Sequence, residues 1–321
     1  MLAAIFSSLS IFAYSQPSVP GRWLSPLLTA HDDGDTSEKS IVVDGNVNFR
    51  LCVTRGTLKV NGWKRNEVRV FVKDGSKFGF KVLEKNDKTQ SPVWITIMGL
   101  SSMRVKNQTP TECIWGNEIE IDVPLNATLD IRGHETETSI DTVKRASVKN
   151  IGGDISIRNV ADGVMASTYR GGLTIENSKG AISLETTTGN ILVFEVAPSE
   201  IGDIFKAKTN SGTISLQSVE HRQIDVNSIS GSVNFNGSIL SGGTYGFSTS
   251  NGSIRLSIPQ DSSCRISASY GFGRFVSELP IKILTEEIHP GPVKSVNGML
   301  GSGDATLKLT TNNGSVTIKK Q

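Results

Sequence analysis

Apolar and polar residues alternate along most of the second half of the chain, and glycine interrupts the alternation at regular points. The clearest copy of this pattern runs from Leu307 to Ile318 and has the form apolar, x, apolar, x, small, x, x, Gly, x, apolar, x, apolar. A period of two places one side of each strand in a core. Glycine between the two apolar pairs allows a sharp turn that is costly for other residues. The pattern therefore predicts pairs of short strands joined at a glycine corner.

The same unit recurs in register along the chain. Its full copies have their glycines at Gly153, Gly171, Gly189, Gly212, Gly231, Gly252 and Gly314. Weaker copies surround Gly56, Thr136 and Gly273, and in one of them Thr136 stands at the glycine position. The small residue three places before the glycine is mostly Thr or Ser, and we expect its side chain to bond the backbone of the turn.

The spacing of the corners decides between architectures. Successive corner glycines from Gly153 to Gly273 lie 18, 18, 23, 19, 21 and 21 residues apart. A hairpin meander would carry Asn-Gly or Asp-Gly at every reversal, whereas one glycine corner recurs here in each repeat. We therefore predict an all-β fold in which residues 125–321 form a parallel β-solenoid, right-handed and β-helix-like because parallel crossovers have that hand. A β-sandwich is the alternative.

Residues 40–124 have a different pattern. Strands alternate there as well, for example around Val70 and Ile121, but glycines are irregular and charges are denser. We expect an N-terminal β cap or small antiparallel subdomain, because a bare solenoid end exposes strand edges. The stretch from Glu286 to Met299 has two prolines and little periodicity, which predicts a surface loop.

The first residues bear on where the protein is located. The segment from Leu2 to Tyr14 is apolar or small, which is the length of a signal-peptide core and too short for a membrane span. Ala13 and Ser15 fit a cleavage site before Gln16, although no Lys or Arg precedes the apolar run. We expect residues 1–15 to be a signal peptide of an exported protein, with a buried first strand as the alternative. Residues 16–39 lack strand periodicity and predict a disordered linker.

Charge and cysteine content exclude some functions. The 33 basic and 31 acidic residues give a net charge of +2, which argues against a nucleic-acid binder with a basic surface. The three cysteines include no CxxC motif or Cys/His cluster, so no zinc site is expected. Cys264 falls on the alternate strand positions that face the core, which predicts a buried side chain. Cys52 and Cys113 could form a disulfide, but their strand neighbours leave this open.

Candidate catalytic residues are scarce. Polysaccharide-cleaving solenoids place two acids around one bond. The outward positions of the second strand in each unit are Ser156, Thr174, Leu192, Ser215, Asn234, Arg255 and Thr317. None is acidic, and Asp154, which follows a corner glycine, has no acidic partner in register. We therefore expect no catalytic residue, no metal site and no cofactor.

Histidine and tryptophan side chains are the remaining candidates for binding residues. The histidines are His31, His134, His221 and His289, and their loop contexts predict solvated surface side chains. Trp63, Trp94 and Trp115 could form a platform for a sugar ring. Trp63 follows a strand and is the best candidate for exposure, with core packing as the alternative.

A resemblance to a known family lies in the segments RGTLKVNGWKRNEVRV, EIEIDVPLNATLDI, VKNIGGDISIRNV and GSGDATLKLTTNNGSVTIKK. In these segments and in their order the chain resembles the bacterial "putative adhesin" family of β-strand-repeat domains of unknown function. HETETSID departs from it, because the family usually has a glycine corner there. The resemblance implies an exported, solenoid-like fold and transfers no binding or catalytic residue.

The sequence therefore favours an exported, non-enzymatic β-repeat protein that serves as an adhesin or envelope scaffold. The expected partner is a surface ligand, either a glycan or a protein, and no nucleic acid or integral membrane segment is expected. A carbohydrate-binding or carbohydrate-active β-helix protein is the alternative function.

Overall fold

The computed structural model describes residues 36–100, 113–288 and 293–321. These residues form 25 β-strands and no helix, so no helix in the described part of the chain could span a membrane. The predicted signal peptide, most of the predicted linker, His31 and His289 lie outside the described residues. Strand β1 begins at Thr36, within the segment 16–39 that the sequence predicts as a linker.

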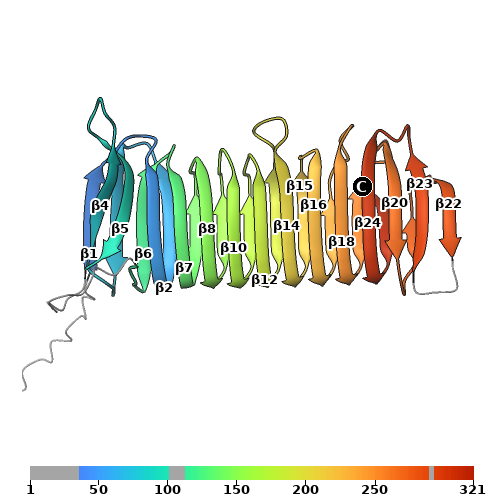
Figure 1. Ribbon diagram of the computed structural model, residues 1–321, viewed down its shortest axis with the longest axis horizontal. Helices are drawn as coiled ribbons and strands as arrows, with labels where there is room; N and C mark the ends of the chain where they lie inside the picture. The colour runs from blue at the N-terminus through green and yellow to red at the C-terminus, as the bar shows by residue number, and fades with distance from the viewer. Residues whose placement is uncertain (1–35, 101–112, 289–292) are drawn as a thin grey trace, which may run out of the picture. The chain divides into compact units, whose positions relative to one another are not determined.

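Two ladders of strands carry the fold, and most of their strands are visible side by side in Figure 1. In spatial order, ladder 1 contains β4 (Phe78–Lys85), β5 (Pro92–Gly99), the first half of β2 (Asn48–Trp63), the first half of β7 (Thr128–Asp141), β8 (Arg145–Gly152), β10 (Val164–Arg170), β12 (Ile182–Thr188), β14 (Ile204–Ser211), β16 (Gln223–Ser230), β18 (Thr244–Asn251), β24 (Ala305–Asn313), β20 (Cys264–Tyr270), β23 (Lys294–Leu300) and β22 (Lys282–Ile288).

Ladder 2 holds the remaining strands. In spatial order, it contains β1 (Thr36–Val42), β3 (Glu67–Lys73), β6 (Glu118–Pro124), the second halves of β2 and β7, β9 (Ile155–Arg158), β11 (Leu173–Glu176), β13 (Ile191–Val196), β15 (Ile214–Val219), β17 (Val233–Asn236), β19 (Ile254–Ile258), β25 (Val316–Lys320) and β21 (Phe275–Ser277). Because β2 and β7 run through both ladders, the strands form one long, open sheet.

Each coil of the stack adds one strand to each ladder, and its apolar residues meet the same positions of the next coil. One buried row of ladder 2 contains Ile155, Leu173, Ile191, Ile214, Val233, Ile254 and Val316. The inward residues of both ladders join one continuous hydrophobic core. Neighbouring strands are parallel from β5 to β20 in ladder 1 and from β6 to β21 in ladder 2. The predicted parallel β-solenoid is therefore confirmed, and the sandwich alternative is discarded.

The corner glycines stack directly on one another. A Cβ atom on Gly231 would overlap the carbonyl oxygen of Gly212, and one on Gly252 would overlap that of Gly231. Gly212 and Gly231 have φ angles of +155° and +152°, whereas Gly252 is not among the glycines with left-handed φ. Close packing between coils is thus the constraint that all three share. Thr136 occupies the predicted glycine position, opposite Gly56.

A column of hydroxyl groups runs beside the glycine column. The Oγ1 of Thr186 donates to the Gly171 carbonyl at 2.9 Å, and that of Thr249 donates to the Gly231 carbonyl at 2.8 Å. The predicted bond from the small residue to the turn backbone is confirmed, but its acceptor lies in the neighbouring coil. Asn150 makes the equivalent bond to the coil in which Thr136 replaces the corner glycine, because its Nδ2 donates to the Thr136 carbonyl at 2.8 Å.

The N-terminal region begins with a complete coil. Strand β2 pairs in parallel with β7 over both ladders, so the weak repeat around Gly56 is the first coil of the stack. Strands β1, β3 and β4 then add antiparallel neighbours to this end. The structure also settles the open cysteine pairing, since Cys52 and Cys113 form a disulfide.

The C-terminal strands do not follow sequence order. Strand β24 lies between β18 and β20 (Figure 1), and the pairing of β25 places it between β19 and β21. The prediction of a surface loop from Glu286 to Met299 is wrong at both ends, because Glu286 lies in β22 and Met299 in β23, which pair antiparallel. Residues 282–287 of β22 are all exposed, so they show no alternation of buried and exposed positions.

Candidate functional site

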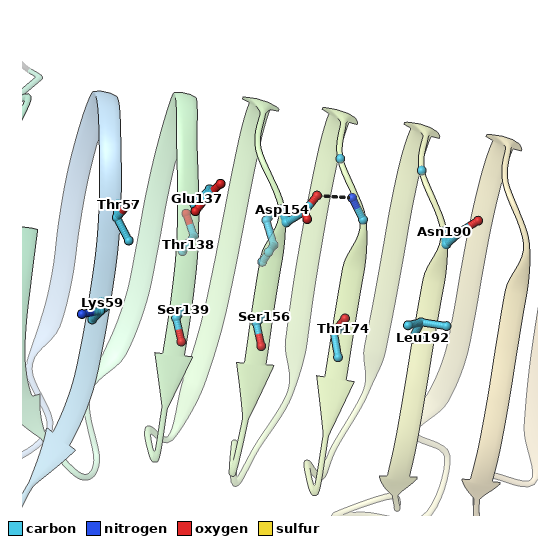
Figure 2. A pocket seen from close by; sticks show the side chains of 14 residues that line it. Thr57, Lys59, Glu137, Thr138, Ser139, Asp154, Ser156, Thr174, Asn190 and Leu192 are labelled. Carbon is cyan, nitrogen blue, oxygen red and sulfur yellow. Dashed lines mark hydrogen bonds between the residues drawn. The ribbon is translucent and has the colours of Figure 1, made fainter. Parts of the chain in front are cut away.

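A shallow groove of about 670 Å³ crosses the outer face of ladder 2. It extends from Lys59 on β2 to Leu192 on β13, and Figure 2 shows the side chains that line it. Ser139, Ser156, Thr174 and Leu192 form a row across four strands. These residues project outward because the apolar residues on either side of each fill the core. The outward positions predicted from the repeat are therefore confirmed.

The polar residues at the upper rim of the groove connect successive coils. Asp154 Oδ1 accepts a hydrogen bond from the Gly172 backbone N–H at 2.7 Å, the dashed line of Figure 2. Asn190 Oδ1 accepts one from the Thr213 N–H at 2.8 Å. Asp154 is thus a turn residue that holds the next coil, as its place after the corner glycine predicts. Glu137 lines the same groove from the adjacent strand β7 and is exposed.

Lys59 lies at the N-terminal end of the groove. Its Nζ donates to Glu118 Oε1 at 2.8 Å. The hydrogen bond raises the pKa of Lys59, and the same bond lowers the pKa of the Glu118 carboxyl. Both side chains are solvated, so the pair contributes little to stability. The charges at this end of the groove are therefore partly neutralised.

Other carboxylates on the outer faces are also paired across strands. Asp130 binds Arg50 at 3.0 Å, and Asp122 binds Arg69 at 2.7 Å. Asp141 accepts hydrogen bonds from Asn159 and Thr142, which lower its pKa despite partial burial. These groups join neighbouring strands. A cross-strand pair of this kind typically contributes about 0.2–1 kcal/mol to stability.

The histidines divide into two classes. His134 is exposed, as predicted. The prediction of a solvated surface side chain is wrong for His221, which is fully buried beside the Phe205 ring at 5.9 Å. Its Nε2 lies 2.8 Å from the Gly180 carbonyl oxygen, and its Nδ1 has no partner. Burial lowers the pKa of this imidazole. The sequence misses it because His221 is in the turn between β15 and β16, outside the repeating pattern.

Each of the tryptophans considered as a sugar platform is covered by an arginine. Trp63 is half-buried, donates its Nε1–H to the Glu67 carbonyl at 2.7 Å, and has Arg65 over its ring. Trp115 is the most exposed of the three, at 40%, and Arg55 lies 4.8 Å from its ring centre. The expectation that Trp63 offers the exposed ring is therefore wrong. Its ring packs against the strand that follows.

Cys264 is buried in the core, as its parity predicts, and burial raises the pKa of its thiol to about 11. Such a thiol is unreactive at neutral pH. Across residues 36–100, 113–288 and 293–321, no group of three or more His, Cys, Asp or Glu side chains is arranged to hold a metal ion.

Large side chains stand outward on ladder 1, where the repeat usually has small polar residues. Met165 and Tyr169 are exposed on β10, and Ile151 is exposed on β8. The outward positions considered from the sequence were those of the second strand in each unit, so these residues of the first strand were missed. Their signal in the sequence is a large apolar residue at a polar position of the repeat.

Comparison with known proteins gives a family for the chain. No curated protein matches it. A solved structure of a "putative cell adhesion protein" from Clostridium sporogenes is 13% identical, with 89% of this chain and 100% of that chain covered and a TM-score of 0.23. The model of a family of unknown function, described as Toastrack DUF4097, matches residues 31–319. The chain therefore belongs to the Toastrack family.

Proposed function

We propose that this protein is a non-enzymatic attachment protein, an adhesin or scaffold that binds a surface ligand through the outer faces of its ladders. The observation that carries this proposal is the row of small hydrogen-bonding side chains across ladder 2. Ser139, Ser156, Thr174, Ser215 and Asn234 stand in register, interrupted by Leu192. Neighbouring strands are about 4.8 Å apart, so the row presents a flat, repeated set of donors and acceptors.

The environment of the carboxylates supports a role without catalysis. Cleavage of a glycosidic bond requires an acid and a second carboxylate on opposite sides of that bond. In the groove, Asp154 is engaged by the Gly172 amide. Asp122 and Asp130 are paired with arginines elsewhere on the outer faces. These three carboxylates thus have structural partners, whereas Glu137 is exposed in the groove.

Export is part of the proposal. The apolar segment from Leu2 to Tyr14 has the length of a signal-peptide core. The disulfide between Cys52 and Cys113 supports the same conclusion, because disulfides persist in oxidising compartments. Amino-terminal sequencing of protein from its native host should find Gln16 as the first residue. An intact Met1 on cytoplasmic protein would contradict export.

An enzyme acting on carbohydrate is the second candidate, and one observation favours it. Glu137 and Asp154 line the same groove from neighbouring strands. The two functions separate when the full chain is tested for binding on a glycan array and for release of reducing sugars from common polysaccharides. We expect binding without turnover. Turnover that is abolished by Glu137→Gln or Asp154→Asn would establish the enzyme instead.

A further inference from the structure

The outer face of ladder 1 carries a patch of large apolar and cationic side chains. We define it by Arg132 and His134 on β7, Lys149 and Ile151 on β8, and Met165 and Tyr169 on β10. Tyr169 is 59% exposed, Met165 51% and Ile151 49%. Exposed apolar residues that occur singly need no explanation, but a contiguous group on neighbouring strands marks an interaction site.

Strand register sets the arrangement of the patch. Arg132 is the direct partner of Lys149, which in turn is the partner of Ser167 on β10. Two residues further along the strands, Ile151 lies level with His134 on one side and Tyr169 on the other, because the flanking pairs are in register. Adjacent positions are about 4.8 Å apart across the strands. The patch is therefore a compact grid, with apolar groups beside cations.

The cations of the patch are available to a ligand. Among the described residues, neither Arg132 nor Lys149 has an ion-pair or hydrogen-bond partner, whereas Arg50 and Arg145 on the same ladder are paired with aspartates. Arg170 at the edge of the patch pairs with Glu135 and adds no net charge. The patch thus has an uncompensated positive charge next to an exposed aromatic ring.

A groove continues the patch along β10. Its volume is about 530 Å³, and its lining includes Met165 and Lys206 together with the acidic residues Asp162, Glu200 and Asp203. Tyr169 and Met165 are four residues apart on one strand, a distance of about 13 Å. Lys206 provides a third cation without an ion-pair partner among the described residues, on the far side of Met165. The groove therefore has room for further units of an extended polymer, while acidic units would bind at the other end of the patch, at Arg132 and Lys149, away from these carboxylates.

From these observations we infer that this patch binds an acidic polysaccharide built of uronic acid units. The Tyr169 ring stacks on the apolar face of a sugar, and Lys149 and Arg132 bind the carboxylates. A neutral glycan would leave these cations without partners. This inference rests on the proposed attachment function and gives it a ligand class.

The test measures binding of trigalacturonate to the full chain by isothermal titration calorimetry. Tyr169→Ala should weaken binding about fivefold to tenfold through loss of stacking, and Tyr169→Phe should retain it. Lys149→Ala should weaken binding about tenfold through loss of a charge-assisted bond. Lys88→Ala, which removes an exposed cation from the turn between β4 and β5, and Phe272→Ala, which removes an exposed ring beyond β20, serve as matched controls. Both should bind like the parent protein.

Several outcomes overturn the inference. One is unchanged affinity in both Tyr169→Ala and Lys149→Ala when thermal melting shows that the variants are folded. Binding of neutral galactotriose without binding of trigalacturonate would also overturn it, while leaving the attachment function in place. Absence of binding to any glycan would also overturn the inference, and would leave a protein as the surface ligand of the attachment function. Tighter binding of single-stranded DNA than of trigalacturonate, lost in Lys149→Ala, would assign the patch to nucleic acid instead.

Discussion

The regular coils from β8 to β19 and the N-terminal strands β1 to β6 pack against one core, but different polar contacts hold them in place. In the regular coils, glycine carbonyls and Thr or Ser hydroxyls repeat the same bond from coil to coil, as at Thr186 and Thr249. In the N-terminal region, the antiparallel strands β3 and β6 are joined by the ion pair Arg69–Asp122, and the Cys52–Cys113 disulfide ties the segment before β6 to β2. The contacts there are individual and do not recur.

This difference shows how a repeat protein is closed at an end. Each inner coil has a neighbouring coil on both sides, so the same set of contacts can repeat from one coil to the next. The terminal strands have a neighbour on one side only, and their other edge faces water. Antiparallel pairing and charged side chains such as Lys39 and Lys81 suit that edge, since charged residues discourage pairing with another chain. Four predictions separate the two kinds of stabilisation.

The largest effect is expected at the glycine column. Gly231→Val places a branched side chain against the Gly212 carbonyl at a left-handed φ. We expect the free energy of unfolding to fall by about 4 kcal/mol, measured by urea denaturation. Hydrogen exchange should rise first in the adjacent coils, from Ile214 to Leu256.

Outward positions on the same strands provide the controls for this prediction. Ser215→Thr and Asn234→Thr should change the stability by less than about 0.5 kcal/mol. Gly252→Ala then separates overlap from backbone strain, because Gly252 has the overlap without the left-handed φ. If Gly231→Val melts like the parent protein, the stacking role of the column is incorrect.

The disulfide should give the next largest effect, confined to the N-terminal region. Replacing Cys52 and Cys113 with alanine opens a loop that spans 61 residues in sequence. We expect a loss of about 2–4 kcal/mol in the stability of this region. Hydrogen exchange should increase in β2 and β6 and stay unchanged from β12 to β16. A uniform increase over all coils would show that the two regions unfold as one unit.

The hydroxyl column should contribute a smaller amount per coil. Thr249→Val keeps the shape of the side chain but removes the donor that reaches the Gly231 carbonyl at 2.8 Å. We expect a loss of about 1–2 kcal/mol, because the buried carbonyl then lacks this partner. Thr174→Val at an outward position of β11 is the matched control and should be nearly neutral in thermal melting. Equal effects of the two variants would argue against the hydroxyl bond.

The smallest effect is expected from pH, through His221. Burial lowers the pKa of His221 from its ordinary value of 6.5, so the unfolded chain binds more protons than the folded one. The free energy of unfolding should therefore decrease as the pH falls below about 6.5. Asp203 and Glu220 lie nearby and oppose the shift. The lowered pKa of Asp203 becomes relevant only below about pH 4, where unfolded aspartate takes up protons.

Urea denaturation at about pH 7.5 and pH 5.5 checks this expectation. His221→Gln keeps a donor for the Gly180 carbonyl but cannot titrate, so its stability should change less between the two pH values. If the stability of the parent protein does not change with pH in this range, the conclusion that His221 is buried as a neutral imidazole is wrong.

The repeating part of the fold could be predicted from the sequence because each coil carries the whole local pattern. Residues such as Ile214 and Gly212 define which side is buried and where the chain turns. The same reasoning correctly placed Ser156 and Thr174 on the outer face. It did not find the patch around Tyr169, since that patch depends on side chains that depart from the repeat on three adjacent strands.

Other features depend on contacts between distant segments and have no local signal. Cys52 and Cys113 approach each other only because Ile114 bonds the backbone of β2. The burial of His221 depends on Phe205 and Gly180, which belong to other turns and strands. The position of β24 in the strand order has no signal in the sequence either. The pattern from Leu307 to Ile318 is shared by the other coils, so it is compatible with any position in the stack.

The interleaved position of β24 and β25 has a consequence for the order in which the protein is completed during synthesis. Coils up to β19 can stack as they leave the ribosome, each on the one made before it. Strand β20 can pair with β23 earlier, but β20 and β21 cannot pair with β24 and β25 until residues 305–320 have been made. A chain that stops before Ala305 leaves two parallel strand edges without the coil that belongs between them. The coil formed by β24 and β25 thus joins the C-terminal strands to the earlier part of the stack.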